Sequence, residues 1–137
     1  MKKIFTLSLI TALAAVIFTG CVKRYGDVNE SYWLSRERAE VVYSDSYCDY
    51  YVVESVNGYA ILRTFGGSRP YEGAVLYGNF SNYGARDFYN RSSGYVFTAE
   101  VMEYWLTYYE ALDAIDYYCP LGKAKVFKST QGSENTK

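Results

Sequence analysis

The sequence predicts an α+β protein built on a small, curved antiparallel sheet of about five strands, arranged as a meander or a partly open barrel. Two observations carry this prediction. Short β-branched and aromatic runs alternate with Gly, Asn and Ser turns, and a helix signal with a start and a stop follows them. We therefore expect a short C-terminal helix after the sheet, with a second short helix near the N-terminus as an optional element.

The strongest strand signal is a hairpin centred on Asn57-Gly58. β-branched and aromatic runs at residues 51–56 and 59–65 flank this dipeptide. Both central residues of a type I′ turn need positive φ, which Asn and Gly tolerate. With a two-residue loop, the expected register places Val53 opposite Leu62.

Three further strands are expected after a Gly-rich break at residues 66–70. The connections between them carry Ser, Asn and Gly at the spacing typical of a meander. The expected strands span residues 74–80, 86–90 and 95–104.

The C-terminal helix is expected to begin at Thr107. A capping box fits there, because the threonine hydroxyl can accept from the third helical amide while Glu110 reaches back to the cap amide. Pro120 and Gly122 end the run. A continuous helix from about Thr98 is the competing interpretation, since apolar residues on both sides of Thr107 can share one stripe.

A short motif occurs twice in the chain. Tyr-Trp-Leu stands at residues 32–34 and 104–106, each time followed by a hydroxyl residue, an acid and, about fifteen residues on, a cysteine. We expect two similar strand-to-helix corners, in which Trp33 and Trp105 are buried anchors of the core. A duplicated recognition motif is the alternative.

The N-terminus carries an export signal. Lys2 and Lys3 precede an uncharged apolar stretch that is too short for a permanent membrane span, and small residues then precede Cys21. This segment resembles the lipobox of bacterial lipoproteins, with Phe18 where that family usually has leucine. The resemblance implies cleavage before Cys21, lipidation of its thiol and acylation of the new amine.

The resemblance also sets the expected organisation and localisation. We expect a signal peptide at residues 1–20, a lipidated tether at 21–30, one globular domain at 31–121 and a flexible tail at 122–137. In the lipoprotein family, a residue other than aspartate after the cysteine is read as permission for transport to the outer membrane. Val22 therefore implies the periplasmic face of the outer membrane, with a Gram-positive membrane surface as the alternative.

The charge of the mature chain restricts its partners. Removal of residues 1–20 lowers Lys+Arg from 14 to 12 against 15 Asp+Glu, so the formal net charge becomes −3. This balance argues against nucleic acid binding, which needs clustered basic side chains, and against a polybasic membrane patch. The expected membrane contact is the N-terminal lipid.

Cys48 and Cys119 remain as an even pair once Cys21 is assigned to lipid. Because an exported protein meets oxidising conditions, we expect a disulfide between them, worth about 4 kcal/mol in the chain-entropy model. Two buried free thiols are the alternative.

The residues needed for most catalysis are missing. The chain has no histidine, which removes the commonest general base and zinc ligand. The Asp-rich segment around Asp45 and Asp49 lacks the spacing of a calcium loop, and residues 66–69 lack the lysine of a phosphate loop. We expect no metal, no cofactor and no enzyme. A carboxylate-dependent glycan hydrolase is the alternative, drawing on Glu54, Glu72, Asp87, Glu100 and Glu103.

Tyrosine is unusually frequent, with 17 of 137 residues. Tyr71 and Tyr83 lie in Gly- and Ser-rich loops beside Arg69 and Asn82, where aromatic, guanidinium and amide groups can contact a sugar or a protein pocket. We expect a non-enzymatic binding or assembly module that contacts an envelope protein or a glycan through these four residues. The alternative is that the tyrosines belong to the core.

Overall fold

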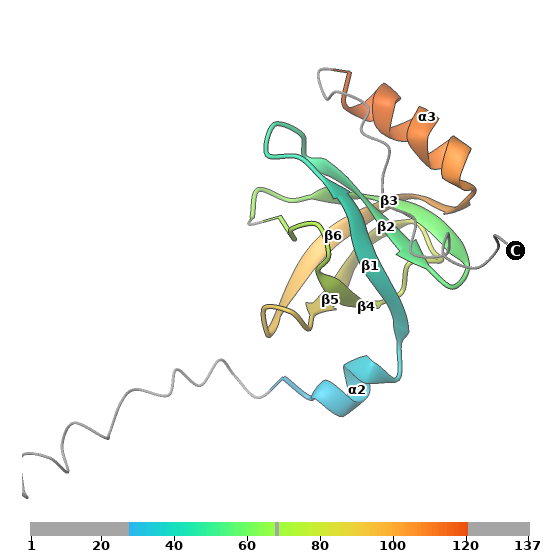
Figure 1. Cartoon of the computed structure of the whole chain (residues 1–137). Helices are drawn as coiled ribbons and strands as arrows, with labels where there is room; N and C mark the ends of the chain where they lie inside the picture. Colours follow the sequence, from blue (N-terminus) through green and yellow to red (C-terminus); the bar gives the residue numbers. More distant parts are fainter. Residues whose placement is uncertain (1–27, 68, 121–137) are drawn as a thin grey trace, which may run out of the picture.

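Six antiparallel strands close into a barrel in the computed structural model, which describes residues 28–67 and 69–120 (Figure 1). Neighbouring strands follow the order β1-β2-β3-β6-β5-β4 and then return to β1. The elements are α2 (Glu30–Leu34), β1 (Glu37–Ser44), β2 (Tyr50–Ser55), β3 (Gly58–Thr64), β4 (Val75–Gly78), β5 (Gly84–Asn90), β6 (Tyr95–Leu106) and α3 (Tyr108–Tyr118). The expected signal peptide, Cys21 and the expected tail lie outside the described residues.

The α+β class, the small antiparallel sheet and the C-terminal helix are confirmed, but the expected strand count and openness are wrong. The strand that the sequence analysis missed is β1, which pairs with both β2 and β4 and so completes the circle. Its buried residues alternate with less buried ones, as in Ala39, Val41 and Tyr43. Closure gives every strand a paired neighbour on both sides.

A short N-terminal helix is present, and it contains the first Tyr-Trp-Leu segment instead of following it. α2 begins at Glu30, and the Asn29 side chain caps it by accepting from the backbone N–H of Tyr32. The last residue of the expected tether is therefore helical. α2 lies against the barrel, where the Trp33 ring is 6.3 Å from that of Tyr89.

The hairpin between β2 and β3 forms with a different register from the expected one. Ser55 pairs with Gly58 and Val53 with Ala60, so the loop residues are Val56 and Asn57. Gly58, with φ +112°, takes the positive φ, whereas Asn57 does not. A Cβ at Gly58 would also lie 2.7 Å from the carbonyl oxygen of Leu106.

The barrel interior is filled by apolar side chains from all six strands and the adjoining loops. Two phenylalanines stack at its centre, with the Phe80 and Phe88 rings 4.9 Å apart. Gly78 makes room for them, because a Cβ there would collide with the Phe88 ring. The interior residues are Ala39, Val41, Tyr51, Val53, Ala60, Leu62, Ala74, Leu76, Phe80, Phe88, Ala99 and Val101.

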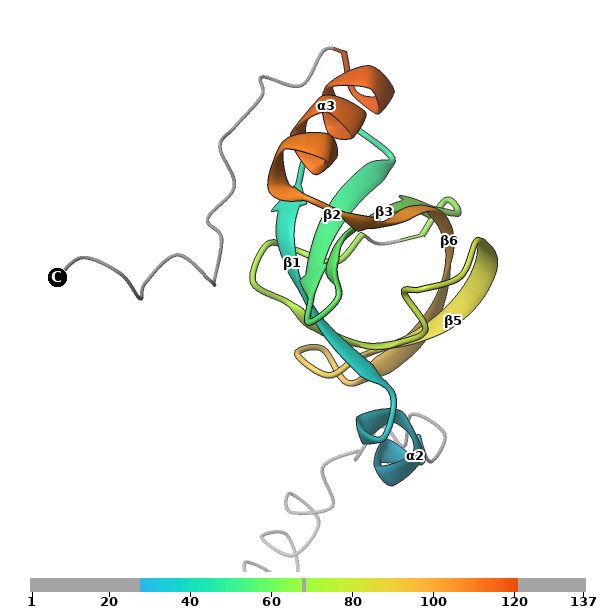
Figure 2. The same cartoon turned by 90° about the vertical axis from the view of Figure 1, so that its right-hand side faces the viewer.

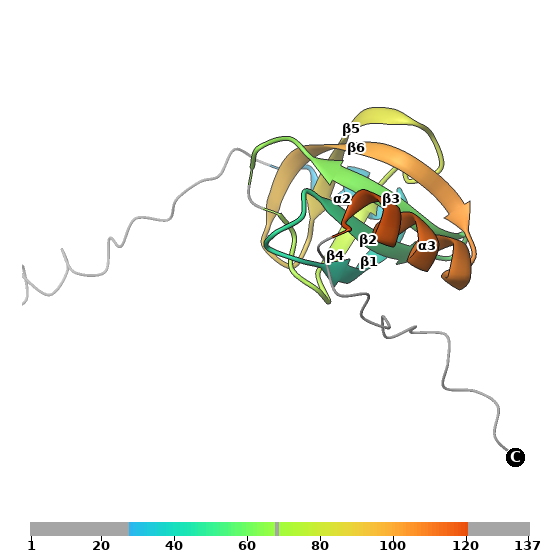
Figure 3. The same cartoon turned by 90° about the horizontal axis from the view of Figure 1, so that it is seen from above.

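A second apolar cluster lies outside the barrel, beneath α3. The helix packs on β2, β3 and β6, so that Val52 and Ile61 are buried on the outer face of the sheet against Ala111 and Ile115 (Figures 2 and 3). Thr107 and Glu110 form the expected capping box, and the strand-then-helix interpretation is confirmed.

The expected disulfide is also present. It joins Cys48, in the loop between β1 and β2, to Cys119 at the end of α3, with 5.8 Å between the two Cα atoms. The bridge fixes the C-terminal end of the helix to the barrel.

Antiparallel connectivity sorts the loops into two ends of the barrel. The hairpin end carries the β2–β3 turn, the β4–β5 loop at residues 79–83 and the last residues of β6. The disulfide end carries the β1–β2 loop at 45–49, the β3–β4 loop and the β5–β6 loop at 91–94.

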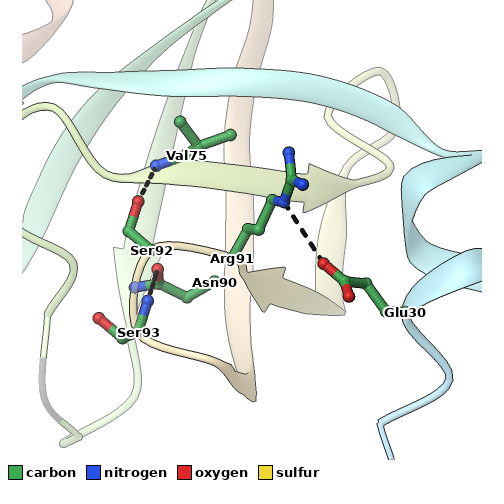
Figure 4. Close-up of polar contacts among 6 residues, drawn as sticks. All are labelled: Glu30, Val75, Asn90, Arg91, Ser92 and Ser93. Atoms are coloured by element: carbon green, nitrogen blue, oxygen red, sulfur yellow. Dashed lines mark hydrogen bonds and ion pairs between the residues drawn. The ribbon is translucent and has the colours of Figure 1, made fainter.

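The β5–β6 loop is tied to both α2 and β4 (Figure 4). The Arg91 guanidinium pairs with Glu30 at 3.4 Å, and the Val75 amide donates to the Ser92 hydroxyl at 2.9 Å. Asn90, fully buried, accepts from the Ser93 amide at 3.1 Å. The ion pair thus links the loop to α2, and the Ser92 hydrogen bond links it to β4.

The two Tyr-Trp-Leu segments do not form similar corners. The first lies in α2 and leads into a strand, whereas the second ends β6 and leads into a helix. Trp33 is half-buried, and Trp105 is 64 % exposed. The expectation of two buried tryptophan anchors is therefore wrong.

Candidate binding surface at the hairpin end

The four residues expected to form one binding site are split between the two ends of the barrel. Tyr71 and Tyr83 are 57 % and 63 % exposed, in agreement with a surface role. Tyr71, however, lies with Arg69 in the β3–β4 loop, and Tyr83 lies with Asn82 in the β4–β5 loop. Because β4 runs from one end of the barrel to the other, the four residues cannot form a single site.

The polar members of the predicted site are used to hold loops. The Arg69 guanidinium donates to the backbone carbonyls of Cys48 and, at 3.3 Å, Ser46. The Asn82 amide donates to the Asn79 side chain at 2.9 Å. Both groups thus stabilise their own surroundings.

Three neighbouring aromatic side chains instead form a surface at the hairpin end, which we name the aromatic ledge: Tyr83, Tyr104 and Trp105. The Tyr104 ring lies between the other two, 4.6 Å from that of Tyr83 and 5.3 Å from that of Trp105. Tyr104 also packs against the interior cluster. The ledge therefore rests on the core while its two outer rings face solvent.

Trp105 has an unusual backbone. Its φ is +59°, the one positive value among the described residues other than glycine. A bulky side chain in this region costs about 1–3 kcal/mol, and such conformations cluster at functional sites. The conformation gives an exposed indole a fixed place at the end of β6.

A chain of hydrogen bonds fixes the indole further. Trp105 Nε1 donates to Ser81 Oγ at 2.9 Å, and Ser81 Oγ donates to Glu37 Oε2 at 3.1 Å. The other oxygen of Glu37 accepts from Asn57 Nδ2 at 3.0 Å. Three elements of the hairpin end thereby hold one ring, whose polar edge is satisfied while its face stays open for contact.

The sequence analysis missed the role of Tyr104, Trp105 and Glu37. The repeated Tyr-Trp-Leu motif did single out the first two, but it was interpreted as core. Periodicity predicts burial for an apolar residue near a strand end, and it contains no information on a positive φ.

Two hollows on the surface of the described residues lie away from the aromatic ledge. One lies between α2 and the β4–β5 side and is lined by Tyr32, Trp33, Arg36 and Arg86, among others. The other, of about 240 Å³, lies beside the disulfide and includes Asp45 and Asp49.

The carboxylates considered for glycan hydrolysis are engaged within the fold. Each accepts a hydrogen bond or pairs with an arginine: Glu54 with Tyr59, Glu72 with the Ser44 amide, Asp87 with Thr98, Glu100 with Arg63 and Glu103 with Tyr118. Nothing in these contacts pairs two of them across a cleft.

No protein-family model, curated protein or solved structure matches this chain. Among the described residues, no helix is long and apolar enough to cross a membrane, and no three Cys, Asp or Glu side chains are grouped to hold a metal ion.

Proposed function

We propose that this chain is a lipid-anchored protein of the bacterial cell envelope, at the periplasmic face of the outer membrane, that binds an envelope protein through the aromatic ledge without catalysis. The lipobox-like segment ending at Cys21 supports the anchor. The observation that carries the binding role is Trp105, which is exposed and yet held at positive φ by a hydrogen-bond network.

The composition of the ledge favours a protein partner. Trp and Tyr are enriched among the residues that contribute most to protein–protein affinity, and a ring held in place loses little conformational entropy on binding. Its two outer rings, Tyr83 and Trp105, are 63 % and 64 % exposed, whereas small ligands bind mostly in concave sites. The projecting rings therefore fit a pocket on a partner better than they fit a small ligand.

The net charge of the chain indicates which charge should surround the pocket on the partner. The mature chain expected after cleavage before Cys21 carries 12 Lys+Arg and 15 Asp+Glu, a formal net charge of −3. Complementary charge raises the association rate and excludes wrong partners. We expect the partner surface to carry an apolar pocket with a basic rim.

A lipid anchor would allow a surface as small as the aromatic ledge to bind a partner specifically. Attachment to the same membrane converts a weak encounter into one at high effective concentration. Three rings can then support a specific complex without a large interface.

The experiment is photo-crosslinking in intact envelopes. A benzophenone side chain replacing Tyr109 in α3, just after the ledge, reports on partners without altering Tyr83, Tyr104 or Trp105. We expect Trp105→Ala and Tyr83→Ala to reduce the crosslinked protein strongly, whereas Tyr117→Ala, which removes an 80 % exposed ring on the far part of α3, leaves it unchanged.

Equal capture by all three variants would contradict the binding role of the ledge. A captured product that resists protease and is cleaved by glycan hydrolases would replace the protein partner with a glycan. Incorporation of a fatty-acid probe tests the anchor separately, because Cys21→Ala should abolish labelling.

A further inference from the structure

We propose that the hollow beside the disulfide is a binding pocket for a primary ammonium group, such as that of a lysine side chain in a peptide. It lies at the disulfide end, away from the aromatic ledge, and it does not depend on the function proposed for the ledge. The pocket encloses about 240 Å³, and the residues that matter for its chemistry are Asp45, Asp49, Tyr50, Tyr118 and the Cys48–Cys119 bridge.

One wall is a fixed aromatic stack. The rings of Tyr50 and Tyr118 lie 4.6 Å apart and 20° from parallel. The Tyr118 hydroxyl donates to Glu103 Oε1 at 3.0 Å, which holds the outer ring in place. Electron-rich ring faces attract cations, with about 0.5–2 kcal/mol per contact depending on exposure.

Two carboxylates supply the charge. Asp45 and Asp49 lie on the β1–β2 loop and line the same pocket. Asp45 Oδ1 accepts from the Tyr47 amide at 3.0 Å, which orients the group without neutralising it. An ammonium offers three donors and carboxylate oxygens accept several hydrogen bonds, so the two sets of groups are complementary.

The surrounding field is also negative. Asp45, Glu72 and Asp116 act together on nearby Tyr43, where burial is the first cause and their charges the next causes of a raised hydroxyl pKa, opposed by Arg69. The two neighbouring arginines are already engaged. Arg69 donates to the carbonyls of Cys48 and Ser46, and Arg63 pairs with Glu100 at 2.6 Å.

The bridge makes the pocket rigid. Cys48 and Cys119 are both lining residues, so the disulfide joins the loop that bears the carboxylates to the helix that bears Tyr118. A pocket whose two sides are covalently linked loses little conformational freedom when a ligand enters.

The test is a titration of the mature, disulfide-bonded protein followed by amide NMR and calorimetry. The probes are acetyl-Gly-Lys-Gly-amide, the same peptide with an acetylated lysine side chain, and glucosamine. We expect the lysine peptide to shift the amide signals of residues 45–50 and 118–119, and the acetylated peptide to leave them in place. Added salt should weaken the interaction. Stronger binding by glucosamine would assign the ammonium to an amino sugar instead of a peptide.

Matched variants separate the contributions of the carboxylates, of the Tyr118 ring and of overall net charge to binding. Asp45→Asn with Asp49→Asn keeps the side-chain shapes and should weaken binding of the lysine peptide by at least about tenfold, which is the effect of losing one charge-assisted hydrogen bond. Asp87→Asn with Asp113→Asn makes the same change in net charge outside the pocket and should have little effect. Tyr118→Ala removes the ring and should abolish binding, whereas Tyr117→Ala, which removes an exposed ring outside the pocket, should leave it unchanged.

The proposal is overturned if the acetylated peptide binds as well as the free amine, if the lysine peptide shifts no pocket amide, or if both double variants weaken binding equally. The last result would show attraction to net charge alone.

Discussion

The two ends of the barrel present tyrosines and acids in opposite ways. At the hairpin end both carboxylate oxygens of Glu37 accept hydrogen bonds from neighbouring side chains, and one of these neighbours, Ser81, also accepts from Trp105. The feature left exposed there is the Trp105 ring. At the disulfide end the rings of Tyr50 and Tyr118 form a wall, and the acids Asp45 and Asp49 share its pocket. The same residue types thus yield an apolar contact surface at one end and a cation-binding pocket at the other.

The difference arises from backbone geometry more than from composition. The hairpin end is shaped by φ values at Gly58 and Trp105 that place an indole outside the barrel. The disulfide end is shaped by a covalent link between a loop and a helix that are distant in sequence.

The largest expected effect is removal of the disulfide. Cys48→Ser with Cys119→Ser opens a connection with a sequence separation of 71 and should lower the free energy of unfolding by about 4 kcal/mol. Urea unfolding of the variant and of the reduced wild type should agree. If the variant is as stable as the oxidised protein, α3 is held by packing alone.

Removal of two buried tyrosine hydroxyls should change the free energy of unfolding in opposite directions. The Tyr59 hydroxyl, toward the hairpin end, donates to Glu54 Oε1 at 3.1 Å, and Tyr59→Phe should cost about 1–2 kcal/mol because a buried carboxylate loses a donor. The Tyr51 hydroxyl, toward the disulfide end, is buried without a hydrogen-bond partner among the described residues. Tyr51→Phe should therefore stabilise the protein by about 1 kcal/mol.

Denaturant midpoints of these two variants check the prediction. A loss of stability in Tyr51→Phe would mean that its hydroxyl has a partner such as a buried water molecule. Equal and negligible effects in both variants would remove the distinction between the two ends of the barrel interior.

The strained backbone of Trp105 should appear as a difference in stability between two variants that truncate its side chain. Trp105→Gly accepts positive φ, whereas Trp105→Ala does not, so the glycine variant should be more stable by about 1 kcal/mol. Both variants lose the exposed indole and should bind the partner equally poorly. Thermal melts decide the first point, and an alanine variant as stable as the glycine variant would show that Trp105 is not strained.

The smallest expected effect is on the free energy of unfolding at alkaline pH. Burial, followed by the hydrogen bond to Glu103, raises the pKa of Tyr118 from 10.0 to about 12. Because the folded state holds this proton more tightly than the unfolded state does, the contribution of Tyr118 is complete below pH 10 and is lost as the pH rises toward 12. Tyr118→Phe should flatten this fall in the free energy of unfolding. Parallel slopes in the wild type and the variant would contradict the shift.

The sequence predicted the elements whose signals are local. Turn residues marked the strands, and the capping box at Thr107 marked the start of α3, because these features depend on a few neighbouring residues. β1 was missed, since residues 37–40 favour a helical turn locally and only pairing with β2 and β4 makes them a strand. The hairpin register was missed because Gly58 alone takes positive φ.

The candidate site was less predictable than the fold. Exposure of Tyr71 and Tyr83 followed from their loops, but their separation depends on strand direction across the whole barrel. Trp105 was placed in the core because hydrophobicity does not distinguish a tryptophan that fills the interior from one displayed at its end.

Closure of the barrel by β1 affects how neighbouring copies of this chain can contact one another. With the lipid anchor proposed above, copies of this chain would meet one another at high density in two dimensions, where an unpaired strand is a template for edge-to-edge aggregation. In this chain each of the six strands pairs with a neighbour on both sides within the same barrel. Copies can therefore accumulate side by side without joining their sheets, and a partner has to recognise side chains rather than add a strand of its own.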